Sequence, residues 1–210
     1  MKRKSKVFSP VAGNGPAYRT RERGAHSLVI TDDGRAEGVR YVPSPNHDER
    51  PPGTRIELLV IHNISLPPGE FGGSAIAELF TNCLDFAAHP YYATIADRRV
   101  SAHFLIRRDG EMIQFVPCGS RAWHAGASDW RGRGRCNDFS IGIELEGSDD
   151  TRFEGVQYEA LAELTRALRA RYPIADIVGH SDIAPGRKTD PGPHFDWARC
   201  RKMLGTASGG

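Results

Sequence analysis

Residues 56–64 read Ile-Glu-Leu-Leu-Val-Ile-His-Asn-Ile, a nearly continuous apolar run that reaches His62 and leads into a Pro-Pro-Gly loop. Apolar residues at successive positions, rather than at alternate ones, are typical of a strand buried on both faces. Such strands occur mainly in parallel sheets that carry helices on both sides. This stretch therefore predicts an inner strand of an α/β fold with a histidine at its end.

Four further apolar segments extend the predicted sheet. Ser140–Leu145 is typical of a second inner strand, and Ile174–Val178 predicts a short strand that runs into Gly179 and His180. Ala102–Ile106 and Met112–Val116 flank an Asp-Gly pair, and Asp-Gly between apolar runs is a strong hairpin signal. We therefore expect two antiparallel strands beside the inner ones.

Helical periodicity separates these strands. Ser74 can cap a first helix, a second should end before Tyr172-Pro173, and a last one should begin near Phe195. The apolar residues at helical spacing are Ile76, Leu79, Phe80 and Leu84 in the first, and Tyr158, Leu161, Leu164 and Leu168 in the second. The sequence thus predicts an α/β fold with a central mixed β-sheet and helices on both faces.

Length and composition favour a single domain. The chain has 210 residues, of which 39% are hydrophobic, enough for one core of ordinary size. We expect a loosely ordered extension over residues 1–38, the domain over 39–204 and a flexible tail over 205–210. The formal net charge is only +2, so no strong field favours nucleic acid or a membrane as a partner, and no obligatory protein partner is predicted.

The N-terminus and the cysteines favour the cytoplasm. A basic head, Met1–Lys6, is followed by Ser, Pro, Gly and Asn where a signal peptide needs an apolar run. No stretch approaches the roughly 18 apolar residues of a membrane span. The cysteines are far apart and form no Cys-x-x-Cys pair, which suits reduced thiols; they are Cys83, Cys118, Cys136 and Cys200.

Three potential metal ligands follow predicted strands: His62, His180 and Asp190. A single histidine is more often a hydrogen-bonded structural residue than a ligand. Strand ends on one side of an α/β sheet, however, converge on a common crevice. Two neutral imidazoles and one carboxylate would leave a fourth zinc position open for water, which is the arrangement that hydrolysis requires.

Three long motifs occur in this order: Leu59–Gly69 (Leu-Val-Ile-His-Asn-Ile-Ser-Leu-Pro-Pro-Gly), Phe139–Gly147 (Phe-Ser-Ile-Gly-Ile-Glu-Leu-Glu-Gly), and Gly179-His180 with Arg187–Pro193 (Arg-Lys-Thr-Asp-Pro-Gly-Pro). With them the chain, from about residue 39 to 204, resembles the zinc N-acetylmuramoyl-L-alanine amidases, whose fold is shared with phage amidases and animal peptidoglycan-recognition proteins. The resemblance is to the cytoplasmic branch that recycles cell-wall fragments. It implies zinc-dependent hydrolysis of the amide bond between (1,6-anhydro-)N-acetylmuramic acid and L-alanine in small soluble muropeptides.

Carried over position by position, the resemblance implies roles for five residues. His62, His180 and Asp190 become zinc ligands, Glu144 the proton-transfer carboxylate and Lys188 a cationic stabiliser. Glu146 lies on the same side of the alternating strand as Glu144, and only family position favours Glu144. Further residues are candidates for the walls of a substrate groove: Asn63, Tyr91, Arg99, Trp123, His124 and Arg135.

Two other functions remain open at this stage. An exported amidase would act on intact cell-wall peptidoglycan, but it would need an export signal. A non-catalytic peptidoglycan-binding module would lack a complete zinc site, whereas this chain has every residue that the resemblance assigns to one. Preferred stem-peptide length and oligomeric state leave no trace in the sequence.

Overall fold

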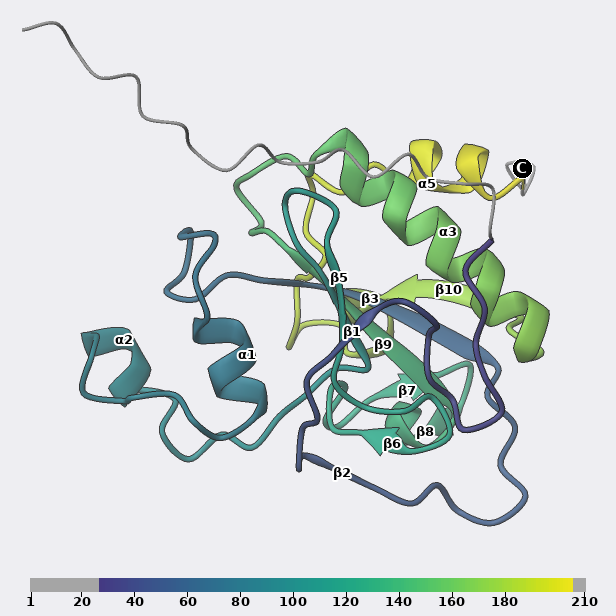
Figure 1. Cartoon of the computed structure of the whole chain (residues 1–210), viewed down its shortest axis with the longest axis horizontal. Coiled ribbons are helices and arrows are strands. Elements are labelled where there is room, and N and C mark those ends of the chain that lie inside the picture. Colours follow the sequence, from purple (N-terminus) through teal and green to yellow (C-terminus); the bar gives the residue numbers. More distant parts are fainter. Residues whose placement is uncertain (1–26, 206–210) are drawn as a thin grey trace, which may run out of the picture.

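A six-stranded mixed sheet forms the centre of the protein, seen here in a computed structural model that describes residues 27–205. Strand β3 is parallel to β9 and β10, β9 to β4, and β1 to β5, while β4 and β5 are antiparallel (Figure 1). In spatial order the strands are β1 (Arg40–Tyr41), β5 (Met112–Gln114), β4 (Phe104–Ile106), β9 (Ser140–Glu146), β3 (Leu58–Ile64) and β10 (Asp176–Gly179).

Strand β3 lies inside the sheet, between β9 and β10, as its unbroken apolar run predicted. Its side chains divide between two packed layers. Leu59 and Ile61 belong to the core cluster that contains the long helix, whereas Leu58 and Val60 belong to a second cluster on the opposite face. Alternation along the strand then places His62 on the same face as Leu58 and Val60.

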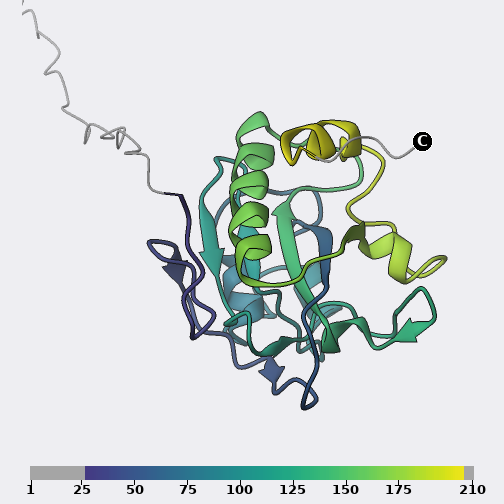
Figure 2. The same ribbon diagram turned by 90° about the vertical axis from the view of Figure 1, so that its right-hand side faces the viewer.

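Helices cover both faces of the sheet, which confirms the predicted architecture. Helix α3 (Gly155–Arg171) and helix α5 (Trp197–Met203) lie together on one side (Figures 1 and 2). Helix α1 (Ala75–Phe80) and the short α2 (Pro90–Ala93) lie on the other side, where they share a core cluster with Leu105 of β4. The sheet is thus the middle of three layers.

Short elements complete the fold around one end of the sheet. Two strand pairs, β2 (His47–Asp48) with β6 (Arg121–Ala122) and β7 (Asp129–Trp130) with β8 (Arg133–Gly134), lie outside the main sheet. Two further one-turn helices, besides α2, are η1 (Cys136–Asp138) and α4 (His180–Ile183). Within residues 27–205, no helix combines the length and the apolar character needed to cross a bilayer.

The turn between β4 and β5 matches the prediction, whereas the end of the first helix does not. The Asp-Gly hairpin forms as expected, with Gly110 at φ +85° in the turn between β4 and β5. Helix α1, however, stops at Phe80, because Asn82 adopts a left-handed φ of 60°. Leu84 therefore lies beyond the helix, although it still packs in the same core cluster.

Residues 27–38 pack against the domain, which differs from the loose extension expected for them. Ile30 and Ala36 form a β-bridge and are 6% and 4% exposed. The Ala36 N–H donates to Gln114 Oε1 at 2.9 Å, and Gln114 Nε2 donates to the Gly34 carbonyl at 2.8 Å. Two apolar residues are too few for a periodic signal. Residues 1–26 of the expected extension, and 206–210 of the expected tail, lie outside the described residues.

Candidate active site

Three neighbouring strands bring the candidate residues together. His62 lies on β3, and its partner in the register of β9 is Glu144, so the two side chains project from the same face of the sheet. His180 follows β10 directly as the first residue of α4. Asp190 is carried back to the same place by the loop after α4, where the Asp190 carbonyl accepts a hydrogen bond from the Ser181 N–H at 2.9 Å.

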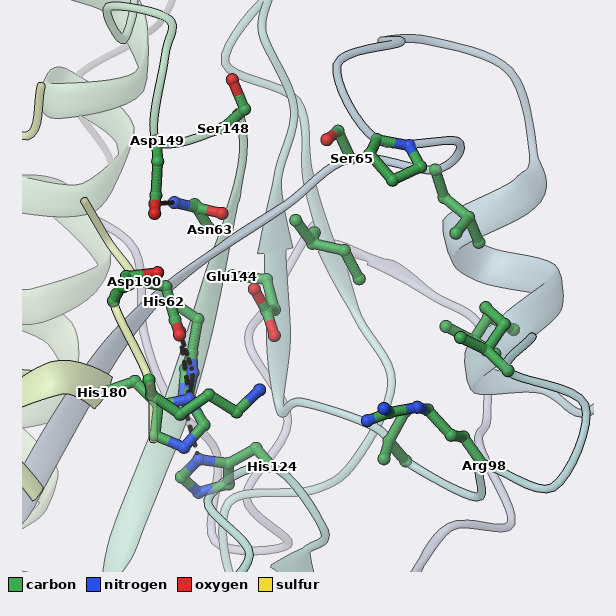
Figure 3. A pocket seen from close by; sticks show the side chains of 18 of the residues that line it. His62, Asn63, Ser65, Arg98, His124, Glu144, Ser148, Asp149, His180 and Asp190 are labelled. Carbon is green, nitrogen blue, oxygen red and sulfur yellow. Dashed lines mark hydrogen bonds and ion pairs between the residues drawn. The ribbon is translucent and has the colours of Figure 1, made fainter. Parts of the chain in front are cut away.

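His62, His180 and Asp190 form a close triangle of potential ligand atoms (Figure 3). His62 Nδ1 and His180 Nδ1 are 2.9 Å apart. Asp190 Oδ2 lies 2.9 Å from His62 Nδ1 and 3.0 Å from His180 Nδ1. His180 Nε2 donates to the Ala125 carbonyl at 3.0 Å, so a neutral His180 directs its Nδ1 lone pair into the triangle. Two nitrogens and one oxygen converging on one point suit zinc with an open coordination position.

The electrostatic environment favours the ligand forms of these groups. Burial lowers the pKa of His62 to about 4 even though Asp190 accepts a hydrogen bond from it. Burial alone would raise the pKa of Asp190, but the close contacts of its carboxylate with the His180 and His62 rings outweigh burial and hold that pKa below its ordinary value. At neutral pH His62 is therefore a neutral imidazole and Asp190 is a carboxylate, as a metal site requires.

Glu144 is a half-buried residue whose Oε2 atom is buried and has no hydrogen-bond partner among the described residues. Burial raises the pKa of Glu144 well above its ordinary value; the charge of Asp190 adds to this, and that of Lys188 opposes it. A carboxyl group in such a state is suited to proton transfer near neutral pH.

Glu146, two residues further along β9, is engaged in the structure instead. Its carboxylate accepts from the Gly72 N–H at 2.6 Å and the Arg108 N–H at 3.1 Å, and lies 3.5 Å from the Arg107 guanidinium. The sequence could separate Glu144 from Glu146 only by family position. In the structure they differ in their contacts, because the Glu146 carboxylate has hydrogen-bond donors around it and Glu144 Oε2 has none among the described residues.

The three candidate ligands and Glu144 line a pocket of about 640 Å³. In Figure 3, Glu144 lies between the histidine cluster on one side and Arg98 on the other. Most residues expected at the site or in its groove line this pocket: His62, Asn63, Tyr91, Trp123, His124, Glu144, His180, Lys188 and Asp190. Asn63 donates from its amide to Asp149 Oδ1 at 2.7 Å, so part of its hydrogen-bonding capacity is already used.

Comparison with known proteins identifies the family. Residues 52–193, which contain all the candidate ligands, match the N-acetylmuramoyl-L-alanine amidase family. The chain belongs to that family. It is 59% identical over 182 residues to 1,6-anhydro-N-acetylmuramyl-L-alanine amidase AmpD of Enterobacter cloacae, covering 86% of this chain and 97% of that protein.

Solved structures agree with this amidase assignment. A crystal structure of a selenomethionine AmpD derivative superposes with a TM-score of 0.82 at 59% identity, covering 84% of this chain and 99% of that one. The Escherichia coli amidase AmiD, solved with anhydro-N-acetylmuramic acid-L-Ala-D-γ-Glu-L-Lys, gives a TM-score of 0.53 at 33% identity over 84% of this chain and 65% of that one. The α/β fold with a central mixed sheet is thus the fold of known amidases.

Two predicted groove arginines are not among the residues that line the amidase pocket. Arg99 donates to the carbonyls of Ala96 and Arg98, both at 3.0 Å, and Arg135 is an exposed side chain 3.1 Å from Asp138 Oδ2. Arg98 lines the pocket instead. Sequence reasoning could not separate adjacent arginines, because side-chain direction in an irregular loop follows no period.

Proposed function

We propose that this amidase uses a zinc ion held by His62, His180 and Asp190 to cleave the bond between N-acetylmuramic acid and L-alanine in soluble 1,6-anhydromuropeptides. The observation that carries the proposal is the triangle of three ligand atoms within 3.0 Å of one another, beside a Glu144 carboxyl group whose Oε2 atom has no partner within residues 27–205. The donor set fits zinc because the second nitrogen of His180 is already used by the Ala125 carbonyl.

The proposed chemistry assigns separate tasks to the metal and to two side chains. Zinc bound at this site supplies Lewis acidity, which activates water and polarises the scissile carbonyl. Glu144 accepts the proton of the attacking water and then delivers it to the departing L-alanine nitrogen. The raised pKa of Glu144 suits this exchange, because the carboxyl group must both take up and release a proton.

Lys188 supplies a positive charge in the pocket that Glu144 also lines. It lines the pocket, and its charge acts on the pKa values of both Glu144 and His62, so it lies within electrostatic reach of each. A fixed cation there stabilises the negative charge that develops on the carbonyl oxygen in the transition state.

The size of the pocket favours a small substrate. A volume of about 640 Å³ is within the usual range for small-molecule sites, which suits one muramyl unit with a short stem peptide. The AmpD relatives are named for the 1,6-anhydro sugar, and the AmiD complex contains a γ-linked D-Glu. A γ-linkage leaves the α-carboxylate of that residue free.

Arg98 is the proposed partner for that carboxylate. It lines the pocket, and no ion pair of its side chain appears among the described residues. A guanidinium can hold a carboxylate through two parallel hydrogen bonds. Arg99 and Arg135 stay predictions for contacts with the stem peptide.

The deciding experiment combines metal analysis with two substrates. Active protein should contain about one zinc per chain, lose activity on chelation and regain it with zinc. The enzyme should cleave purified anhydromuropeptide far better than insoluble wall, with the freed stem peptide identified by mass. His62→Ala should lose the metal, whereas Glu144→Gln should keep the metal and lose turnover.

Three results would change the assignment. Full activity without a metal would exclude the zinc site, and binding without cleavage would favour a recognition module. Equal or better cleavage of intact wall would favour an amidase of the exported kind. We also propose that the enzyme acts in the cytoplasm, and fractionation of the native cell tests this separately.

A further inference from the structure

A chain of hydrogen bonds leads away from the proposed metal site through His124. His62 Nε2, on the far side of the ring from the ligand triangle, lies 3.0 Å from His124 Nδ1. His124 Nε2 lies 3.1 Å from Ser140 Oγ, a fully buried hydroxyl at the start of β9. The two imidazoles meet edge to face, with an interplanar angle of 85°. His124 itself is outside the ligand triangle.

The protons in this chain can be arranged consistently with a metal at His62. A ligand Nδ1 carries no proton, so a neutral His62 then has its proton on Nε2 and donates it to His124 Nδ1. His124 in turn carries its proton on Nε2 and donates to Ser140 Oγ, which can accept. The chain thus provides an acceptor for the Nε2 proton of the His62 tautomer that can bind a metal through Nδ1.

The opposite arrangement suits the metal-free protein. Ser140 then donates to His124 Nε2, His124 donates from Nδ1 to His62 Nε2, and His62 places its own Nδ1 proton toward Asp190. Both arrangements contain the same number of protons, because each imidazole remains neutral and the hydroxyl only turns. Ser140 can accept in one arrangement and donate in the other, so no member of the chain loses its partner in either.

Strand β9 provides the space that this chain needs. A Cβ atom built on Gly142 would lie 2.5 Å from Cγ of His124, so the ring occupies the place of a side chain at that position. Behind it, His103 accepts from the Gly142 N–H at 3.0 Å through Nδ1. The ring of His124 is therefore held between β9 and the His62 ring, rather than lying loose on the pocket wall.

We propose that His124 is a positioning residue, which orients His62 and accepts the Nε2 proton of its metal-binding tautomer, while Ser140 orients His124 in the same way. The proposal rests on the zinc site proposed above, but it assigns to His124 a task other than contact with the substrate. Outer partners of this kind typically change metal affinity about 10- to 100-fold when they are removed.

The test compares three substitutions of His124 by metal affinity, measured by competition with a chromophoric chelator. His124→Phe keeps a ring over Gly142 but offers no acceptor, so zinc should bind about 10- to 100-fold more weakly. His124→Asn places its amide oxygen the same number of bonds from Cβ as Nδ1, so it should restore most of the affinity. In His124→Gln the longer side chain reaches toward Ser140 rather than His62, so this variant should bind zinc as weakly as His124→Phe does. His194→Ala, at an exposed histidine, is the matched control and should bind as the wild type does.

A spectroscopic readout separates positioning from packing. In the zinc-loaded enzyme the His62 Nε2 proton should give a slowly exchanging low-field NMR signal, which disappears in His124→Phe and returns in His124→Asn. A role in filling space alone would make Phe or Gln better than Asn.

The outcomes are decisive in each case. Wild-type affinity in folded His124→Phe, or Asn no tighter than Gln, would overturn the proposal while leaving the zinc site intact. If His124→Phe fails to fold, the zinc affinities of His124→Asn and His124→Gln are compared instead, and an Asn variant that binds no tighter than the Gln variant overturns the proposal. A wild-type protein that binds no zinc would overturn the proposed function as well, so the two failures are distinguishable.

Discussion

Replacing Glu144 by glutamine should stabilise the metal-free protein while it removes activity. Glutamine has almost the same shape but no charge, and Glu144 has a buried Oε2 atom that has no partner among the described residues. A buried polar atom left without a partner costs about 1–3 kcal/mol, and more when it is charged. Glutamine keeps a polar atom at this position, so only the extra cost of the charge is relieved, and the melting temperature should rise by roughly 2–4 °C for each kcal/mol recovered in a domain of this size.

The pH dependence gives the sign of this effect. Burial raises the pKa of Glu144 well above the ordinary value of 4.5, so the folded state favours the protonated form. Below the ordinary pKa the carboxyl group is protonated in both states, and its contribution to stability is complete. As the pH rises through the folded pKa that stability is lost. The advantage of Glu144→Gln should therefore be small near pH 4.5 and should grow toward alkaline pH.

Chelated protein unfolded by heat or urea at a series of pH values measures the effect, because bound metal would add its own stabilisation. Glu146→Gln is the matched control on the same strand and the same face. Its carboxylate accepts from the Gly72 and Arg108 N–H groups, so the substitution should destabilise by about 1.5–3 kcal/mol at neutral pH. A gain for both variants, or no gain for Glu144→Gln at any pH, would refute the reasoning.

Three other predictions follow from the same contacts. Lys188→Ala should lower kcat with zinc content unchanged, since its charge acts on the transition state; a change confined to KM would contradict this role. Gly142→Ala should cost about 1–3 kcal/mol in urea unfolding and weaken zinc binding, because the new methyl group displaces the His124 ring. Only Cys83 should react with a thiol reagent at pH 8 in the native protein, since the other three cysteines are buried and burial raises the pKa of Cys118 to about 12; mass analysis would count the adducts.

The local pattern of the sequence was sufficient for the main elements of the fold. An unbroken apolar run predicted the inner strand β3, and Asp-Gly between two apolar runs predicted the β4–β5 hairpin. Both signals depend on neighbours along the chain, which is why they can be read without the tertiary structure. Residues 27–38 escaped this reading because Ile30 and Ala36 become buried only when the rest of the domain is in place.

The candidate ligands were named from their places after strands and from the family motifs, but their convergence depends on the tertiary structure. His62 and His180 are 118 residues apart, and only the parallel pairing of β3 with β10 brings their Nδ1 atoms to 2.9 Å. Such long-range pairing leaves no periodic mark on the sequence.

By itself the sequence determined the α/β layering, the hairpin and the residue types available for hydrolysis, because these follow from hydrophobic period and turn chemistry. The tertiary structure alone decided which chemically equivalent neighbours face the pocket. Glu144 and Glu146 share one face of β9, yet within the described part of the chain only Glu146 accepts hydrogen bonds from backbone N–H groups. Arg98 lines the pocket where Arg99 was expected. These choices depend on the groups that surround each side chain in space, and those groups come from distant parts of the chain.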